Sequence, residues 1–267
     1  MYLAMDDIGS DKVEKINKYS NPKDKWRKID EIALVYGFLG IQISGMYKKK
    51  FGLDLYNIPY FICDYRLTYH IGGLYYLLSE DDVINCNDMI EQSLNIAESY
   101  GMEDVSFHPP FIYENIDKRH LSKDYLKKII TKWLPKYKNH GISLSLETHV
   151  SPEYFIFKNL DDFAEFASSY PDLGVLIDVS HNFYDGYKEN NIIEILGNLK
   201  ITGLHLSDSL VGVEFETGTH LPVGKGNIKF QKILQHFKDK DIYGALEIRG
   251  NSRDILSSYF NLNKYII

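Results

Sequence analysis

Short apolar runs alternate along the chain with longer amphipathic segments. Eight runs have the length and composition of buried strands, and they are Tyr2–Met5, Phe38–Ile43, Arg66–His70, Val105–His108, Ile142–Glu147, Gly174–Asp178, Ile201–His205 and Gly244–Glu247. Nearly continuous apolar character is typical of strands that are covered on both faces, as in a parallel sheet. The pattern therefore predicts eight buried, parallel strands.

Between several of these runs, apolar residues recur with helical spacing. In Ser122–Leu134 they return every three or four positions while lysines fill the opposite face, and Ser122 is placed to cap the N-terminus. Asn87–Tyr100 carries one apolar stripe and stops at Gly101, a residue type that often ends helices. Weaker patterns predict two further helices, in Leu160–Ala167 and Ile228–Phe237.

The alternation of strand and helix predicts an α/β fold in which the sheet closes into a (β/α)₈ TIM barrel. Residues 1–267 contain no Ser-, Gly- or Pro-rich linker, so we expect a single domain. An open, doubly wound sheet is the alternative. It normally carries a Gly-rich phosphate-binding turn after its first strand, and Gly9-Ser10-Asp11 does not supply one.

The composition narrows the class of protein. Hydrophobic residues make up 44% of the chain and charged residues 25%, as in ordinary globular proteins. The 30 basic and 37 acidic residues give a net charge of −7, which argues against a globally basic surface for nucleic acid. Two cysteines, Cys63 and Cys86, are too few for a disulfide framework, and no signal-peptide or membrane-spanning pattern occurs. We expect a cytoplasmic protein without a membrane partner.

Residues able to bind metal stand at the C-terminal ends of six of the predicted strands. They are His70, His108, Glu147, Asp178, His205 and Glu247, and His181 and His220 follow in the loops after the sixth and seventh strands. A residue of this kind at one strand end is most often a structural, hydrogen-bonded group. Here eight such residues stand at the C-terminal face, where TIM barrels form their active sites, and together they predict a shared site.

The remaining histidines serve as a comparison. His120, His140 and His236 lie in or beside predicted helices, and we expect them to be exposed to solvent. His149 follows Glu147 by two residues and could face either the mouth of the barrel or the solvent. We assign it at most a supporting or substrate-binding role.

The chemistry of the set indicates a divalent metal. Carboxylates and imidazoles without thiolates form catalytic sites for Zn²⁺, Mn²⁺ or Co²⁺, which keep a position open for water or substrate. A glutamate can also bridge two cations about 3.5–4 Å apart. Glu147 is placed for that role in chain order, so we expect two ions, or one.

Several short motifs resemble, in the same order, those of the xylose isomerase-like TIM-barrel superfamily. They are Val105-Ser106-Phe107-His108-Pro109, Leu146-Glu147, Gly174–His181, Gly203–Asp208, His220–Ile228 and Leu246-Glu247. The resemblance runs from about Trp26 to Glu247. That superfamily includes the endonuclease IV type of apurinic/apyrimidinic endonuclease and many isomerases and epimerases of sugars and sugar phosphates.

The endonuclease IV pattern implies three metal ions. His70, His108 and Glu147 would hold the first, and Glu147, Asp178, His205 and Glu247 the second. His181 and His220 would hold the third with an Asp two residues before His220, but this chain has Gly218 there. The motifs Gly73-Leu74-Tyr75-Tyr76 and Leu176–His181 also depart from that branch, so the resemblance does not supply the side chains that wedge into an abasic site.

The isomerase pattern implies one cation on Glu147, Asp178, His205 and Glu247. Glu147 and Glu247 would then move a proton between adjacent carbons, and His181 would bind substrate. These enzymes often carry an Arg several residues after the His of the seventh strand, which Asp208–Val213 lacks.

Two features favour the endonuclease branch in this comparison. His70 and His108 complete the ligands for a second ion, and Lys48-Lys49-Lys50 follow the second strand, where a phosphate backbone would approach. An ordinary solvated charge run is the other interpretation of the lysines. The favoured hypothesis is a metal-dependent phosphodiesterase acting on abasic DNA through a metal-bound hydroxide near Glu147. The alternatives are an isomerase or epimerase of a small sugar or sugar phosphate, and a non-catalytic barrel that binds a sugar or a partner.

Overall fold

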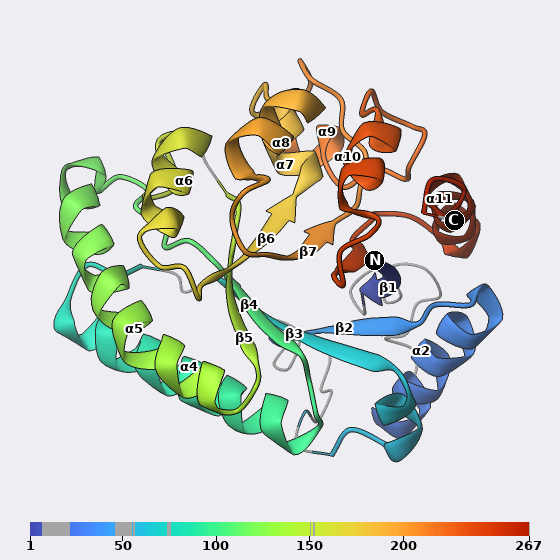
Figure 1. Ribbon diagram of the computed structural model, residues 1–267, viewed down its shortest axis with the longest axis horizontal. Helices are drawn as coiled ribbons and strands as arrows, with labels where there is room; N and C mark the ends of the chain where they lie inside the picture. Colours follow the sequence, from blue (N-terminus) through green and yellow to red (C-terminus); the bar gives the residue numbers. More distant parts are fainter. Residues whose placement is uncertain are drawn as a thin grey trace.

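The strands close into a parallel barrel in chain order, as the pattern of apolar runs predicts. This computed structural model describes residues 1–6, 22–45, 55, 57–73, 76–149, 151 and 153–266. The strands are β1 (Tyr2–Asp6), β2 (Gly40–Ser44), β3 (Arg66–Gly73), β4 (Asp104–His108), β5 (Ser143–Glu147), β6 (Gly174–Asp178), β7 (Ile201–His205) and β8 (Tyr243–Leu246). Each pairs with the next, and β8 pairs with β1 (Figure 1). The predicted TIM-barrel fold is confirmed.

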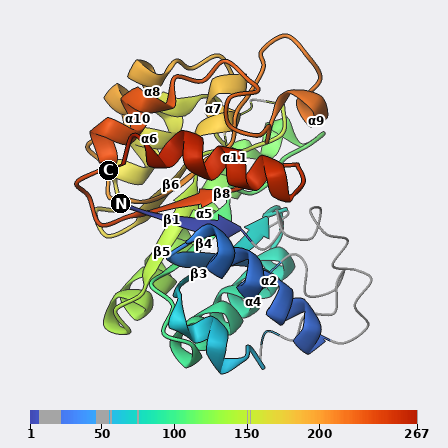
Figure 2. The same cartoon turned by 90° about the vertical axis from the view of Figure 1, so that its right-hand side faces the viewer.

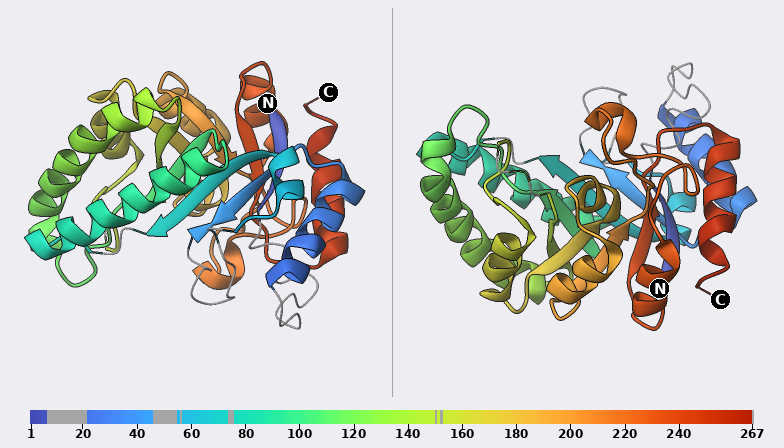
Figure 3. Two further views of the ribbon diagram at one scale, coloured as in Figure 1. Left: turned by 90° about the horizontal axis from the view of Figure 1, so that it is seen from below. Right: turned by 90° about the horizontal axis from the view of Figure 1, so that it is seen from above.

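The helices form a ring around the barrel (Figures 1 and 3). They are α2 (Pro22–Tyr36), α4 (Glu80–Ser99), α5 (Arg119–Asn139), α6 (Leu160–Ser168), α7 (Val179–Tyr184), α8 (Glu189–Leu196), α9 (Phe215–Gly218), α10 (Phe230–Phe237) and α11 (Ser252–Asn263), with 3₁₀ turns at Tyr60–Asp64 and Ile116–Lys118. Helices α2 and α11 lie side by side (Figure 2). The hydroxyl of Tyr259 in α11 donates a hydrogen bond to the carbonyl of Gly37, the residue that follows α2. Among the described residues, no helix is both long and apolar enough to cross a membrane.

Three helix starts differ from the sequence prediction, and the smallest difference is in α10, which begins at Phe230 rather than Ile228. Helix α5 begins at Arg119, so Ser122 is buried inside it and does not cap it. Helix α4 begins at Glu80 rather than Asn87, and the hydroxyl of Ser79 accepts a hydrogen bond from the Asp82 amide as its N-cap. The first turn of α4 is acidic, and its negative charges interact favourably with the positive end of the helix dipole. These acidic residues do not extend the apolar stripe. Periodicity alone therefore missed it.

The strand boundaries shift by smaller amounts. β2 runs from Gly40 to Ser44 instead of Phe38–Ile43, β3 continues to Gly73, and β8 ends at Leu246. Leu39, which periodicity placed inside β2, is 65% exposed. Glu247 therefore lies one residue beyond the last paired position of its strand.

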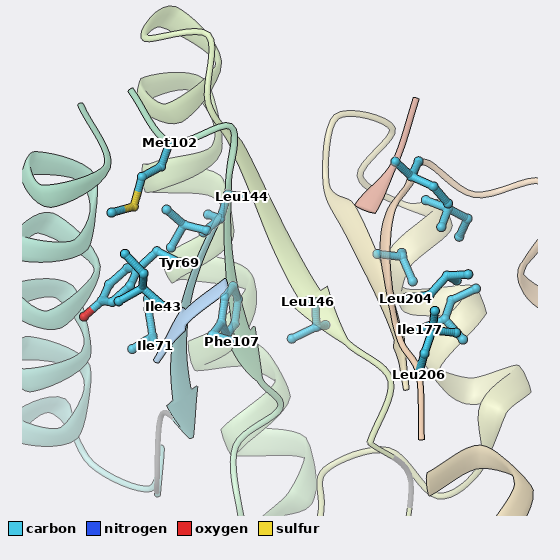
Figure 4. Close-up of a cluster of buried hydrophobic side chains, with 14 of the residues drawn as sticks. Ile43, Tyr69, Ile71, Met102, Phe107, Leu144, Leu146, Ile177, Leu204 and Leu206 are labelled. Atoms are coloured by element: carbon cyan, nitrogen blue, oxygen red, sulfur yellow. The ribbon is translucent and has the colours of Figure 1, made fainter. Parts of the chain in front are cut away.

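The apolar core lies between the strands and the helices rather than inside the barrel. Figure 4 shows part of it, where Phe107 and Leu144 lie on one side of the view, and Ile177 lies with Leu204 and Leu206 on the other. The interior of a TIM barrel is usually filled with bulky aliphatic side chains. Here a small separate cluster fills part of it, consisting of Tyr2, Ala4, Leu176, Tyr243 and Ala245. Buried polar residues occupy much of the rest, including Gln42, Thr68, Asp104, Ser106 and Ser145.

Two glycines make room for the aromatic rings of the interior. A Cβ atom at Gly203 would collide with the ring of Tyr243, and one at Gly40 would collide with the ring of Tyr2. Because β7 and β2 lack side chains at these points, both rings can lie inside a narrow barrel. The interior thus has a fixed shape below the C-terminal face.

Candidate metal centre

The inward-facing alternation of the strands brings the predicted ligands to one end of the barrel. In β4 and β5, for example, Ser106 and Ser145 are buried in the interior two residues before His108 and Glu147. His70, Glu147, Asp178 and His205 are buried, while the side chains of His108 and Glu247 are 17% and 20% exposed. All eight predicted residues contact at least one other member of the set.

The first group joins three strands around one carboxylate oxygen. Oε2 of Glu147 lies 3.1 Å from Nε2 of His108 and 3.4 Å from Nε2 of His70. The two imidazole nitrogens are 3.0 Å apart. Nδ1 of His70 lies 3.0 Å from the hydroxyl of Ser106, which fixes the orientation of the ring.

The second group uses the other oxygen of the same carboxylate. Nδ1 of His205 lies 3.5 Å from Oε1 of Glu147, 3.6 Å from Oδ2 of Asp178 and 2.9 Å from Oε2 of Glu247. Glu147 therefore lies between the two groups, with one oxygen directed to each. This is the arrangement that a bridging ligand requires.

The third group consists of Asp178, His181 and His220, whose ligand atoms lie within 4.8 Å of one another. Nε2 of His181 is 3.0 Å from Nε2 of His220, and Nδ1 of His181 is 3.4 Å from Oδ2 of Asp178. The other oxygen of Asp178 accepts a hydrogen bond from the amide of His181 and caps α7. One carboxylate oxygen thus positions the helix while the other faces the cluster.

His220 is held in a strained backbone conformation. Its φ angle is 53°, in the left-handed region that residues with a Cβ seldom adopt. Its amide donates to the hydroxyl of Ser180, and its carbonyl accepts from the amide of Arg249 at 2.7 Å. Strain of this kind is typical of functional sites because the surrounding contacts must hold it in place.

Gly218 closes the position where the endonuclease pattern has an aspartate. A Cβ atom there would lie 2.8 Å from the carbonyl oxygen of Leu210 and 2.6 Å from a methyl group of Val213. The backbone turn therefore has no space for a longer side chain. His181 and His220 receive no carboxylate from this segment.

Several buried polar atoms in the cluster have no hydrogen-bond partner. They are both carboxylate oxygens of Glu147, Oδ2 of Asp178, Nδ1 of His181 and Nδ1 of His205. Leaving such atoms unpaired costs free energy, and native proteins rarely do so without a functional reason. A divalent cation would satisfy them, since oxygen and imidazole nitrogen are its ordinary ligands. The residues present therefore fit a metal ion.

The electrostatics place some of the ligands in the form that binds metal and leave others in competition with a proton. Burial lowers the pKa of both His70 and His181 to about 3, so both rings are neutral at physiological pH. Burial by itself raises the pKa of Glu147, but attraction to His108 and His205 outweighs it and holds that pKa well below its usual range. Glu147 raises the pKa of His108 despite its burial, and Glu247 holds the pKa of His205 well above its usual range, so a cation competes with a proton at these two rings. A bound cation requires the neutral imidazole and the ionised carboxylate.

His149 faces the mouth of the barrel. Its ring stacks on Phe155 with centroids 3.9 Å apart, and it lies 4.2 Å from the ring of His181. The ring of Phe215 in α9 is 5.3 Å from that of His181. The rings of His149, Phe155 and Phe215 thus form an aromatic wall beside the ligands. Periodicity could not predict it, because neither Phe155 nor Phe215 belongs to a regular apolar pattern.

The other sequence expectations have mixed outcomes. His120, His140 and His236 are exposed, as predicted. Lys48-Lys49-Lys50, and Leu74 and Tyr75 of the departing motif, lie outside the described residues. Gln42 is a residue that the sequence analysis missed, since it stands within an apolar run and carries no motif, yet its amide oxygen lies 2.9 Å from Nε2 of His205.

Comparison with known proteins adds a family and a set of similar barrels. The family model described as a xylose isomerase-like TIM barrel matches residues 36–259. An uncharacterized protein of Methanocaldococcus jannaschii is 24% identical over 169 residues, which cover 63% of this chain and 63% of that protein. The chain thus matches less than two thirds of that relative's length.

Three solved structures show how widely the barrel is shared. A D-tagatose 3-epimerase-like protein superposes with a TM-score of 0.79 and 19% identity, over 100% of this chain and 97% of that one. The IolI protein, solved with a bound zinc atom, superposes with a TM-score of 0.73 and 15% identity, over 100% of this chain and 98% of that one. The D-psicose 3-epimerase of Clostridium cellulolyticum H10, solved with D-tagatose, superposes with a TM-score of 0.72 and 11% identity, over 100% of this chain and 99% of that one. At these identities the likeness establishes the fold.

Proposed function

The chain belongs to the xylose isomerase-like TIM-barrel family, and we propose that it is a divalent-metal-dependent isomerase or epimerase of a small sugar or sugar phosphate. The observation that carries the proposal is a cluster of buried ligand atoms without partners. Nδ1 of His205 lies 3.5 Å from Oε1 of Glu147 and 3.6 Å from Oδ2 of Asp178, and none of the three atoms has a hydrogen-bond partner. The epimerases among the similar structures support the substrate class.

Glu147, Asp178, His205 and Glu247 would hold the cation, which supplies a Lewis acid that polarises a substrate carbonyl or hydroxyl when bound. Attraction to neighbouring histidines outweighs burial and lowers the pKa of Glu247 as well as that of Glu147, so both carboxylates are ionised and able to accept a proton. They reach the cluster from β5 and from the end of β8, and each can take a proton from one carbon or return it to the next. His149, His181 and the aromatic wall would orient the sugar and exclude water.

This proposal replaces the endonuclease IV-type activity favoured in the sequence analysis. The third group lacks a carboxylate from position 218, and the similar structures above include sugar epimerases, while none of them supports abasic DNA as a partner. One observation keeps phosphodiester hydrolysis as a second candidate. His70, His108 and Glu147 form a separate group that could hold a second ion, which a single-metal isomerase does not require.

The test is an assay in deuterated water. The protein, loaded in turn with Mn²⁺, Co²⁺ and Zn²⁺, is incubated with a panel of ketoses and ketose phosphates, and proton NMR follows the formation of epimer and the uptake of deuterium at the reacting carbon. Parallel reactions contain a duplex with one abasic site. We expect epimerisation with deuterium uptake, and no incision of the duplex.

Glu147→Gln is the decisive variant, since it removes the charge and keeps the shape. We expect its rate to fall by about 10²–10⁴-fold, the usual effect of losing a general base. His120→Gln is the matched control, because His120 is an exposed residue of α5 and is not one of the eight predicted ligands. Incision of the abasic duplex that disappears in Glu147→Gln, without any epimerised sugar, would establish the second candidate instead.

A further inference from the structure

A chain of buried hydrogen bonds runs through the barrel interior below His205. Nε2 of His205 lies 2.9 Å from Oε1 of Gln42, and the amide nitrogen of Gln42 lies 3.5 Å from the hydroxyl of Tyr243. That hydroxyl donates to Oδ2 of Asp104 at 2.9 Å. The chain therefore connects β7, β2, β8 and β4, from the C-terminal face to the opposite end of the barrel.

The direction of each hydrogen bond follows from the chemistry of its members. An ionised Asp104 only accepts, and it already accepts from the hydroxyl of Ser145, so the proton of Tyr243 must point to it. The oxygen of Tyr243 is then free to accept from the amide nitrogen of Gln42. That orientation of the amide turns the Gln42 oxygen to His205, which must donate from Nε2.

The consequence appears at the opposite nitrogen of the ring. With its proton on Nε2, a neutral His205 presents a lone pair at Nδ1, and Nδ1 faces Glu147, Asp178 and Glu247. A nitrogen surrounded by carboxylate oxygens must hold either a proton or a metal ion, and a metal ion binds there only through the Nδ1 lone pair. The chain thus selects the tautomer that binds metal.

We propose that Gln42 is a positioning residue that holds His205 in its metal-binding tautomer, with Tyr243 and Asp104 fixing the orientation of the Gln42 amide. The proposal rests on the metal site of the proposed function and extends it to residues that no ion would touch. Partners of this kind behind metal-binding histidines generally affect metal affinity by 10–100-fold.

The surroundings keep the chain in one arrangement. Gln42, Asp104, Tyr243 and His205 are all buried, so water does not compete for their hydrogen bonds. The ring of Tyr243 fills the space left by the missing side chain of Gly203 on β7. The phenol therefore cannot swing away from Asp104 without moving the strands.

The experiment measures Co²⁺ affinity by titration, following the visible absorption of the ion. Gln42→Leu removes the acceptor for His205 and keeps a side chain of similar length. We expect its affinity to fall by about 10–100-fold. Thr68→Val is the matched control, because Thr68 pairs with Gln42 in the β2–β3 register, is equally buried, and has a hydroxyl without a hydrogen-bond partner. We expect Thr68→Val to bind Co²⁺ within threefold of the wild type.

A second readout reports the tautomer directly. Nitrogen-15 NMR of the Zn²⁺-loaded protein, labelled at histidine and assigned with His205→Gln, should show the His205 proton on Nε2. Gln42→Glu retains an acceptor oxygen, and we expect it to keep this signature and to recover most of the affinity that Gln42→Leu loses. Tyr243→Phe removes only the hydroxyl, so we expect a smaller loss of affinity, and it replaces Gln42→Leu should that variant fail to fold.

The outcomes separate the two proposals. A wild-type protein that binds no Co²⁺ contradicts the proposed function. A wild type that binds Co²⁺, with a Gln42→Leu variant of equal affinity or a His205 proton on Nδ1, contradicts only the role of Gln42. A purely structural role would lower the thermal stability of both Gln42→Leu and Gln42→Glu while leaving their Co²⁺ affinities equal to that of the wild type.

Discussion

At the scale of single residues, Glu147 shows what the sequence could and could not predict. Its place at the end of an apolar run predicts that it faces the mouth of the barrel, and the structure confirms this. Which histidine each of its oxygens faces depends on side-chain positions across four strands, which no local pattern encodes. Gln42 and His149 are harder still, since their roles come from contacts with residues far away in the chain.

Asp104 gives a prediction for the pH dependence of stability. Burial raises its pKa to about 6, although hydrogen bonds from Ser145 and Tyr243 oppose the shift. The folded state then holds a proton that the unfolded state releases between roughly pH 4 and pH 6, so this group lowers the free energy of unfolding as the pH rises through that window. The loss is about 3 kcal/mol, from two pKa units at 1.36 kcal/mol each.

Asp104→Asn removes this titration and keeps an oxygen for Tyr243. We therefore expect the free energy of unfolding of the variant, relative to that of the wild type, to rise by up to about 3 kcal/mol between pH 4 and pH 7. Urea unfolding of both metal-free proteins across that range measures it. Parallel stability curves for the two proteins would show that Asp104 does not titrate in this window.

Gly203→Ala tests the packing of the barrel interior. The added Cβ would collide with the ring of Tyr243, and we expect the free energy of unfolding to fall by about 1–3 kcal/mol, as overpacking usually costs. Urea unfolding measures the change. In a Tyr243→Ala background the same substitution should cost far less, because the ring is gone, and strictly additive effects would disprove the contact.

At the scale of elements, strands were predicted more closely than helices. A buried strand in a parallel sheet is short and contains few charged residues, so its C-terminal end is marked here by a charged residue, as Glu147 and Asp178 show. A helix can begin with polar residues that serve as caps and as partners for the helix dipole. For that reason α4 and α5 begin earlier than their apolar stripes indicate.

The N-cap of α4 can be tested with two serines of the same segment. Ser79→Ala removes the oxygen that accepts from the amide of Asp82, and we expect the free energy of unfolding to fall by about 1 kcal/mol. Ser99→Ala, at the exposed end of the same helix, should change it by less than about 0.5 kcal/mol. Chemical denaturation of both variants measures the difference, and equal losses would argue against capping by Ser79.

At the scale of the whole molecule, the closed barrel explains why ligands from six strands converge. Parallel strands in chain order place all their C-terminal ends on one face, so the fold and the location of the site could be predicted together. The branch of the family could not be predicted from the sequence, because it depends on details such as the lack of space for a side chain at Gly218. The number of possible ligands favours the endonuclease branch, and the proposed function replaces it with the isomerase alternative because position 218 supplies no carboxylate.

Metal binding should stabilise the entire barrel, since the ligands come from β3 to β8. At an ion concentration a hundredfold above the dissociation constant, binding contributes about 2.7 kcal/mol, which corresponds to a rise in Tm of roughly 5–10 °C. Calorimetric melting of the protein with a chelator and then with Mn²⁺, Co²⁺ or Zn²⁺ measures this rise. Glu147→Gln should lose it, and an unchanged Tm with all three ions would contradict the metal site.

The tight turn around Gly218 also bears on how this barrel could evolve. Glycine and aspartate codons can differ by a single base, so an aspartate at position 218 is a short mutational step away. The collisions with Leu210 and Val213 make that step unfavourable until the turn itself has been rebuilt. A third carboxylate beside His181 and His220 therefore requires more than one substitution, because the backbone around α9 has to change first.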